Sequence, residues 1–198
     1  ITDFRYSEHV REEVDDVEFI ITPIPPLKYL TENKLIPKDT KLAIEDKRIS
    51  YDEYRTLISL FPQKNLYPVS DIISGLRSVK DAGEIAKLRQ AASITDSVFA
   101  HIRGIIKPGI TERDIAAEIA FQIRKQGGEK EGFDTIAAFG PRSALPHAKT
   151  GSHKLAENEL IVLDFGAVYE GYHADITRTL LIGEPGRRQM EIYSAVLE

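Results

Sequence analysis

Two β-prone runs that meet at a short turn restrict the fold of this chain more than any other feature of its sequence. The segment 160–182 reads LIVLDFGAVYEGYHADITRTLLI, and its two runs are joined at 169–171, which is Tyr-Glu-Gly. A glycine between two such runs favours a tight turn, so the segment predicts a β-hairpin. The stretch 135–139 is also β-like, so we expect several strands after residue 133.

An aspartate lies inside each run of this hairpin. Asp164 and Asp175 are equally distant from a turn centred between Tyr169 and Glu170, so they are predicted to face each other directly across the two strands. Opposed like charges are unfavourable in a sheet, and an unpaired carboxylate within an apolar strand is costly. A divalent cation shared by both side chains removes both costs, and oxygen ligands suit Mn, Mg, Co or Zn ions. We therefore interpret the pair as candidate metal ligands.

A plainer interpretation of these aspartates also exists. An aspartate in a hairpin often accepts hydrogen bonds from the turn or pairs with an arginine, and Arg178 lies nearby in the sequence. For either aspartate alone this plainer interpretation is favoured. For the opposed pair inside apolar strands, metal binding is favoured.

One histidine is a candidate for chemistry at the same site. His147 ends the segment SALPH, in which Pro146 stiffens the approach of the chain. An imidazole held in this way can hydrogen-bond a carbonyl or move a proton near neutral pH, although on this segment alone a role as a surface loop residue is favoured. His173 is a rival, because it shares a strand face with Asp175 in an H-x-D pattern. The remaining histidines have the ordinary environment of helices or a polar loop: His9, His101 and His153.

Composition excludes several classes of protein. The formal net charge is −5, which gives no sign of a nucleic-acid surface, and the chain has no cysteine for disulfides, thiol nucleophiles or zinc. No apolar run reaches the roughly 18 residues of a membrane-spanning helix. No G-x-G-x-x-G loop, P-loop or G-x-S-x-G elbow is present. A cysteine-free composition fits a reducing compartment, so we expect a cytoplasmic protein.

The rest of the chain divides into two regions. Residues 1–77 alternate short helical patterns with β-prone runs at 17–22, 41–45 and 66–69, which predicts an α/β layer with parallel pairing. The segment 78–83 is interpreted as a linker. Region 84–198 opens with a long helix from a capping box of Asp81 and Glu84, followed by a second helix that starts at Thr111. The spacing in the long helix predicts a buried stripe made of these residues: Ile85, Leu88, Ala92, Thr95, Phe99, Ile102 and Ile106.

The order of these features resembles a known family. The segments RSVKDAGEI, SALPH, VLDFGAVYEGYHADITRT and QMEIYSAVLE resemble the creatinase/aminopeptidase P/prolidase family of "pita-bread" metallohydrolases. The likeness is greatest to bacterial Xaa-Pro aminopeptidases and Xaa-Pro dipeptidases. It implies an incomplete α/β creatinase-like N-terminal domain, followed by the first half of an α+β pita-bread catalytic domain.

The resemblance also implies a site and a reaction. It makes Asp164 and Asp175 the first two ligands of a dinuclear centre, with Asp175 bridging two divalent ions, Mn before Co or Zn. His147 matches the family's substrate-binding histidine, while His173 falls outside the metal shell. The implied reaction is hydrolysis of the peptide bond before proline in Xaa-Pro peptides or dipeptides. Family members are commonly homodimers, and neither nucleic acid nor membrane is an expected partner.

The same resemblance leaves two alternatives open. The chain starts without a methionine and its N-terminal layer has few strands, while the family completes its metal site with one more histidine and two glutamates that come later in the chain. We therefore expect this chain to be a fragment cut at both ends and inactive alone. One alternative is a non-catalytic pita-bread module that binds peptides or proteins. The other is a metal-independent creatine-type amidinohydrolase, which the retention of both aspartates disfavours.

Overall fold

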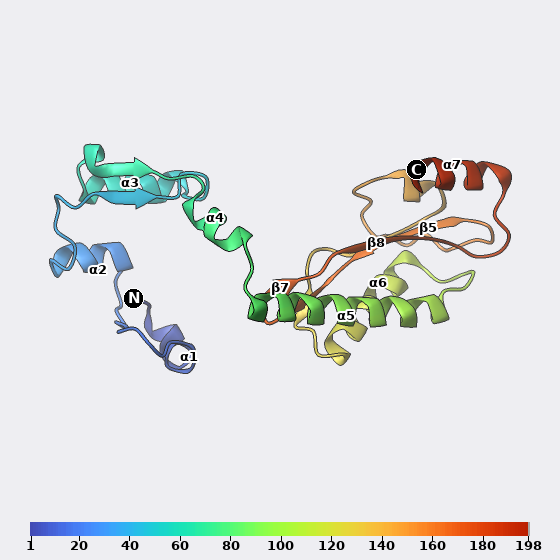
Figure 1. The fold of residues 1–198 in the computed structure, drawn as a ribbon, viewed down its shortest axis with the longest axis horizontal. Helices are drawn as coiled ribbons and strands as arrows, with labels where there is room; N and C mark the ends of the chain where they lie inside the picture. Colours follow the sequence, from blue (N-terminus) through green and yellow to red (C-terminus); the bar gives the residue numbers. More distant parts are fainter. Residues whose placement is uncertain (198) are drawn as a thin grey trace. The chain divides into compact units, whose positions relative to one another are not determined.

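The computed structural model describes residues 1–197 and divides them into two compact units (Figure 1). One unit spans Ile1–Val79, and the other begins at Lys80. Each unit has its own hydrophobic core. The assignment of domains to 1–77 and 84–198 remains a prediction. Within the described residues, no helix combines the length and the apolar character needed to cross a membrane.

The first unit is a small α/β layer. Leu57, Phe61 and Leu66 form its buried core, beside a pair of parallel strands, as the alternating pattern predicts. The run 17–22 is an exception, since it forms no named strand and only Ile21 makes a bridge, to Thr2. The elements of this unit are η1 (Phe4–Tyr6), α1 (Ser7–Glu13), α2 (Pro26–Glu32), β1 (Leu42–Ile44), α3 (Tyr51–Leu60), η2 (Gln63–Asn65), β2 (Leu66–Pro68) and α4 (Ile72–Ser78).

Two capped helices open the second unit. Helix α5 (Ala82–Ile105) starts with the expected capping box of Asp81 and Glu84, so its first turn includes two residues of the predicted linker. Helix α6 (Glu112–Lys125) starts with a capping box at Thr111. The predicted stripe of α5 is partly wrong: Ile85 is 41% exposed, and the buried side is formed by Ala91, Ile94, Thr95, Val98 and Ile102. These residues step by three and four, but the helix is rotated from the predicted orientation.

Two antiparallel three-stranded sheets follow. One long hairpin runs through both sheets, with β5 and β6 in its first arm and β7 and β8 in its second. The sheet orders are β4-β5-β8 and β3-β6-β7. Figure 1 shows α5 and α6 on one side of β5 and β8, and α7 on the other. The remaining elements are β3 (Lys130–Glu131), β4 (Ile136–Phe139), η3 (Gly140–Ala144), β5 (Leu160–Phe165), β6 (Ala167–Tyr169), β7 (Tyr172–His173), β8 (Ile176–Leu181) and α7 (Arg187–Leu197).

The register of the hairpin differs from the predicted one. The turn is Glu170-Gly171, with φ of 45° and 75°, and Tyr169 pairs with Tyr172. Two successive positive φ angles are those of a type I′ turn. The turn therefore lies one residue later than predicted, and Asp164 directly faces Thr177 rather than Asp175.

The tip of the hairpin is attached to the start of α5. The Tyr172 hydroxyl donates a hydrogen bond to Glu84 Oε1 at 3.0 Å, and the acceptor carboxylate raises the pKa of Tyr172. Lys87 forms an ion pair with Glu170 at 3.0 Å. These contacts fix the turn end of the hairpin against the helix that forms one wall of the core.

Candidate metal centre

The two aspartates lie on the face of the hairpin that points away from the core. In β5, Ile161, Leu163 and Phe165 are buried against the helices, so the alternation of a strand turns Asp164 to the opposite face. In the observed register Asp175 lies opposite Gly166, which makes the two aspartates diagonal neighbours on one face. The direct opposition predicted from the sequence is wrong, but the shared face is retained.

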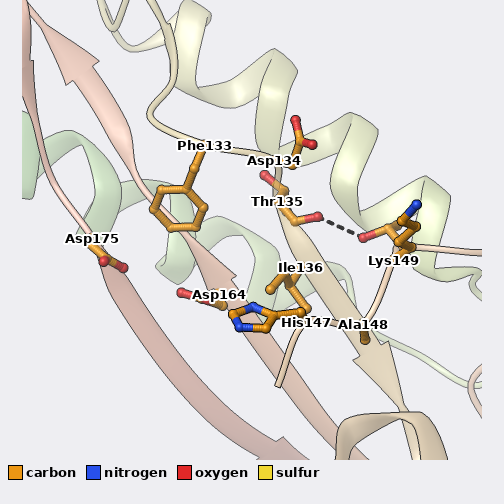
Figure 2. A pocket seen from close by; sticks show the side chains of 10 residues that line it. Phe133, Asp134, Thr135, Ile136, His147, Ala148, Lys149, Asp164 and Asp175 are labelled. Carbon is orange, nitrogen blue, oxygen red and sulfur yellow. Dashed lines mark hydrogen bonds between the residues drawn. The ribbon is translucent and has the colours of Figure 1, made fainter. Parts of the chain in front are cut away.

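A single cavity collects the candidate residues. It has a volume of about 770 Å³ and is lined by residues from β4, β5, the loop after η3 and the segments next to these strands. Figure 2 shows the His147 ring and both carboxylates turned into it. Its lining residues are Phe133, Asp134, Thr135, Ile136, His147, Ala148, Lys149, Thr150, Asp164 and Asp175.

Neither aspartate has a cationic partner among residues 1–197. The Arg178 guanidinium donates to the carbonyl oxygen of Thr177 at 2.9 Å and lies 5.8 Å from the centre of the Phe99 ring. Arg178 follows Thr177 in β8, so its side chain leaves on the helix side of the sheet. The plainer interpretation, in which Arg178 neutralises an aspartate, does not describe this geometry.

Asp164 is oriented by a neighbouring hydroxyl. Thr177 Oγ1 donates a hydrogen bond to Asp164 Oδ1 at 2.9 Å, across the β5–β8 pair. Asp164 lines the cavity, and its Oδ2 accepts no hydrogen bond from the described residues. Nothing in the sequence marks Thr177 as a functional residue, because threonine is common in strands.

His147 is exposed and lies in the middle of the 140–151 loop. Its imidazole has no hydrogen-bond partner within the part of the chain that the structure describes. The loop backbone turns just before it, because the Leu145 N–H donates to Arg142 O at 3.0 Å and the Ala148 N–H to Leu145 O at 3.2 Å. The neighbouring Ala148 is buried and fixes the loop to the protein. The ring is thus presented to the cavity by the backbone alone.

The other histidines have ordinary partners or lie elsewhere. His101 Nε2 is 2.8 Å from Glu118 Oε1, and His153 Nε2 is 3.2 Å from Glu159 Oε2. His173 does not line the cavity of the aspartates. Across residues 1–197, no group of three or more His, Asp or Glu side chains is arranged to hold a metal ion.

Comparison with known families agrees with the two-unit division. The creatinase/prolidase N-terminal domain profile matches residues 1–79, and the profile of metallopeptidase family M24 matches residues 86–198. The chain belongs to metallopeptidase family M24. The fold of this M24 chain is a creatinase-type N-terminal domain followed by part of an M24 catalytic domain.

Relatives of this M24 chain include peptidases from bacteria and archaea. It is 36% identical over its whole length to the uncharacterized peptidase YqhT of Bacillus subtilis, and this match covers 56% of that protein. It is 36% identical to a Xaa-Pro dipeptidase of Pyrococcus furiosus over 89% of this chain and 51% of the relative. The chain therefore spans about half the length of the curated relatives it matches.

Solved structures give the same relationship. A Xaa-Pro dipeptidase from Bacillus anthracis superposes with a TM-score of 0.90 at 35% identity, over 99% of this chain and 55% of that chain. An X-Pro aminopeptidase from Thermotoga maritima superposes with a TM-score of 0.85 at 38% identity, over 99% and 56% respectively. The similarity extends over both units.

The donor set fits a hard divalent cation in part. Two carboxylates on one strand face, without a cationic partner among residues 1–197 and open to a cavity, supply the anionic oxygens that such ions bind. Two carboxylates alone do not fill the coordination of these ions. The described residues therefore fit one side of a metal site.

Proposed function

We propose that the protein is a metal-dependent exopeptidase that hydrolyses the peptide bond before proline, as a Xaa-Pro dipeptidase or aminopeptidase. In this proposal Asp164 and Asp175 are ligands of two divalent ions, Mn²⁺ before Co²⁺ or Zn²⁺. The remaining ligands come from other parts of the full-length protein. The substrates are Xaa-Pro dipeptides or longer peptides that begin with Xaa-Pro.

One observation carries the proposal. Two like-charged carboxylates share a strand face, lack a cationic partner among residues 1–197, and open into the cavity that His147 also lines. Holding two negative charges on one face without compensation is unfavourable, and a cation between them relieves this repulsion. The membership of family M24 and the similarity to Xaa-Pro dipeptidases supply the class of substrate.

Each residue has a separate task in this reaction. When bound, the two ions supply a Lewis acid and an activated water. Asp164 and Asp175 hold the ions, and Thr177 fixes the rotation of the Asp164 carboxylate. His147 binds the carbonyl oxygen of the scissile bond through an imidazole N–H, which stabilises the negative charge that develops on that oxygen.

The exposed apolar part of the cavity orients the substrate. Phe133 and Ile136 line the same cavity as the two aspartates and His147, and Ile136 lies next to the His147 ring (Figure 2). An aromatic ring and a branched aliphatic side chain give a substrate side chain an apolar surface, while the carboxylates and His147 face the polar peptide group. This division of the lining suits a small peptide bound in one orientation.

Asp175→Asn in the full-length protein tests the proposal. Loss of a bridging charge is expected to abolish cleavage of Xaa-Pro peptides, while the far-UV circular dichroism and the unfolding midpoint stay near those of the wild type, because Asp175 is exposed. Asp134→Asn is the matched control, since Asp134 lines the same cavity from another segment. Near-normal turnover by Asp175→Asn would refute the assignment.

The alternative classes give different results in the same assay. A non-catalytic module that binds peptides would bind Xaa-Pro peptides without cleaving them, in the wild type as well as in the variant. A metal-independent amidinohydrolase would not cleave Xaa-Pro peptides, and it would hydrolyse a creatine-type substrate even after exhaustive treatment with a chelator. The wild-type protein is therefore assayed with Mn²⁺ and after chelation before the variants are compared.

A further inference from the structure

The most deeply buried charge in the second unit has no task in the function proposed above. Glu112 is the first residue of α6 and is 0% exposed. It is not needed to cap the helix, because Thr111 and Asp114 already form the complete capping box. Burying a carboxylate is costly unless it is paired and fully hydrogen-bonded. The contacts of Glu112 should therefore show what its burial accomplishes.

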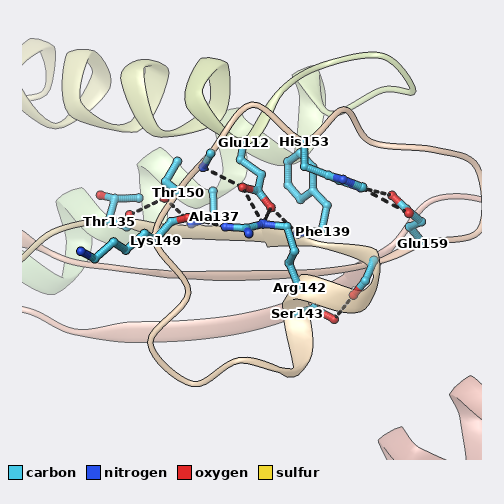
Figure 3. A network of polar contacts seen from close by, with 12 residues as sticks. Glu112, Thr135, Ala137, Phe139, Arg142, Ser143, Lys149, Thr150, His153 and Glu159 are labelled. Carbon is cyan, nitrogen blue, oxygen red and sulfur yellow. Dashed lines mark hydrogen bonds and ion pairs between the residues drawn. The ribbon is translucent and has the colours of Figure 1, made fainter.

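The hydrogen bonds of this carboxylate reach the loop that carries His147 and the residue just before that loop. Glu112 Oε1 accepts hydrogen bonds from the Phe139 N–H at 3.1 Å and from Arg142 Nε at 2.9 Å. Glu112 Oε2 accepts from the Gly151 N–H at 2.7 Å and from Arg142 Nε at 3.2 Å. The 140–151 loop is thus bonded at the residue before it, near its start and at its last residue (Figure 3).

Arg142 and Gly151 are suited to this arrangement. Arg142 Nη2 donates to the carbonyl oxygen of Lys149. The arginine therefore joins the Glu112 carboxylate to the part of the loop that follows His147. A side chain at position 151 would place its Cβ 3.1 Å from Glu112 Oε2, so glycine lets the carboxylate reach the backbone N–H. The carboxylate and the guanidinium together close the loop from both sides.

His147 depends on this closure. It lies within the loop, is exposed, and has no side-chain partner within residues 1–197. Thr150 supplies another anchor, accepting from the Ala137 N–H at 3.1 Å and donating to the Thr135 carbonyl oxygen at 2.8 Å. The buried Ala148 and a hydrogen bond from the Arg113 N–H to the Gly151 carbonyl oxygen at 3.1 Å add to it. The position of the imidazole relative to the aspartates is therefore set through the backbone of the loop, which Glu112 holds at both ends.

We propose that Glu112, through Arg142, is a positioning residue that holds the 140–151 loop and so places His147 over the cavity of Asp164 and Asp175. The proposal rests on the function proposed above, since it assigns Glu112 a task only if His147 acts on substrate. Glu112 itself contacts neither substrate nor metal. It acts on the reaction through the loop.

The test is a double-mutant cycle between Glu112→Gln and His147→Ala in the full-length protein, with Mn²⁺ present. Glu112→Gln keeps the size of the side chain but loses the charge that pairs with Arg142. We expect kcat for a Xaa-Pro peptide to fall on the order of 10- to 100-fold, because small displacements of a substrate-binding group are that costly. In the His147→Ala background the same change should reduce kcat less than about twofold, because residues that act as one unit are not additive.

Hydrogen–deuterium exchange gives a readout that does not depend on activity. In Glu112→Gln the amides of 140–151 should exchange faster, while those of β5 and β8 keep their wild-type protection. Glu118→Gln is the matched control, a glutamate of the same helix that pairs with His101 outside the loop. Arg142→Lys is the second variant if Glu112→Gln does not fold, and its loss of kcat should also vanish in the His147→Ala background.

The possible results separate the two proposals. In one case, Glu112→Gln keeps the wild-type kcat and the wild-type exchange rates of the loop, while His147→Ala has a reduced kcat. This result would overturn the positioning role and leave the proposed function standing. An equal loss from Glu112→Gln with and without His147 would overturn it as well, because Glu112 would then act elsewhere. Wild-type turnover by His147→Ala would refute the proposed role of His147, and the positioning role with it.

Discussion

The hydroxyl of Thr177 determines how Asp164 faces the cavity. It donates to one carboxylate oxygen at 2.9 Å, from the residue directly opposite on the partner strand. A hydrogen-bond donor behind a metal-binding carboxylate fixes the rotation of that carboxylate and keeps its other oxygen directed at the ion. If Asp164 binds a metal, Thr177 therefore contributes to the affinity without touching the ion.

Thr177→Val is expected to weaken Mn²⁺ binding by about tenfold or more, because hydrogen bonds behind metal ligands contribute on that order. Valine has nearly the shape of threonine and favours strands, so the fold should be retained. Thr177→Ser keeps a hydroxyl and should recover most of the affinity. The measurement is a titration with Mn²⁺, and unchanged affinity in Thr177→Val would mean that this hydrogen bond does not orient a ligand.

Side chains that are unusual for their position can be recognised from the sequence, and side chains with an ordinary alternative explanation cannot. Asp164 is conspicuous because a carboxylate is rare in an apolar strand. Thr177 fits a strand, and Glu112 fits the first turn of any helix, where acids favour the helix dipole. Only the structure shows that Thr177 orients Asp164 and that Glu112 is buried under the His147 loop.

Among the elements, the hairpin shows what sequence patterns determine. Its two runs and its turn region are predictable, since alternation and a glycine are local signals. The predicted register is wrong by one position at the turn, because the turn type depends on φ, and Glu170 adopts a φ of 45° that is uncommon for glutamate. The prediction for the run 17–22 is wrong for a related reason: β propensity does not supply a partner strand.

Gly166 gives a prediction about this hairpin. It lies between β5 and β6, where a Cβ would collide with the backbone carbonyl of Ala174. Gly166→Ala should therefore lower the free energy of unfolding of the second unit by about 1–3 kcal/mol or more. Urea denaturation measures this change.

Gly104→Ala is the matched control, since nothing lies within 4 Å of a Cβ built at Gly104 in α5. That variant should unfold at the wild-type urea concentration or slightly above it, because alanine favours helices. If both variants had the same midpoint, the close approach of the two strands at Gly166 would not be real.

In the molecule as a whole, two separate cores suggest two separate stabilities. Ile115, Ile119 and Ile123 are fully buried in the second unit, and Phe61 in the first is 2% exposed. Because no described residue belongs to both cores, we expect chemical denaturation to proceed in two transitions. The order of the two capped helices in the second unit is predictable from the sequence, since a capping box is a local pattern. The burial of each core side chain is not predictable in this way, since it depends on which helix and sheet faces pack together.

Core truncations test this independence. Ile119→Ala should lower the free energy of unfolding of the second unit by about 2–5 kcal/mol. Phe61→Ala should lower the free energy of unfolding of the first unit by about 3–5 kcal/mol. Each variant should leave the other transition unchanged. Fluorescence and circular dichroism during denaturation follow both transitions, and a single shared transition displaced by either variant would show that the units unfold as one.

The metal content of the full-length protein tests the central claim most directly. After loading with Mn²⁺ and removal of excess ion, elemental analysis is expected to find two ions per chain in the wild type and in Asp134→Asn, whose side chain lines the same cavity. Asp164→Asn should lose mainly one ion, and Asp175→Asn, which removes the proposed bridge, should lose both. Two ions per chain in the double variant Asp164→Asn/Asp175→Asn would contradict the assignment of this hairpin as the metal centre.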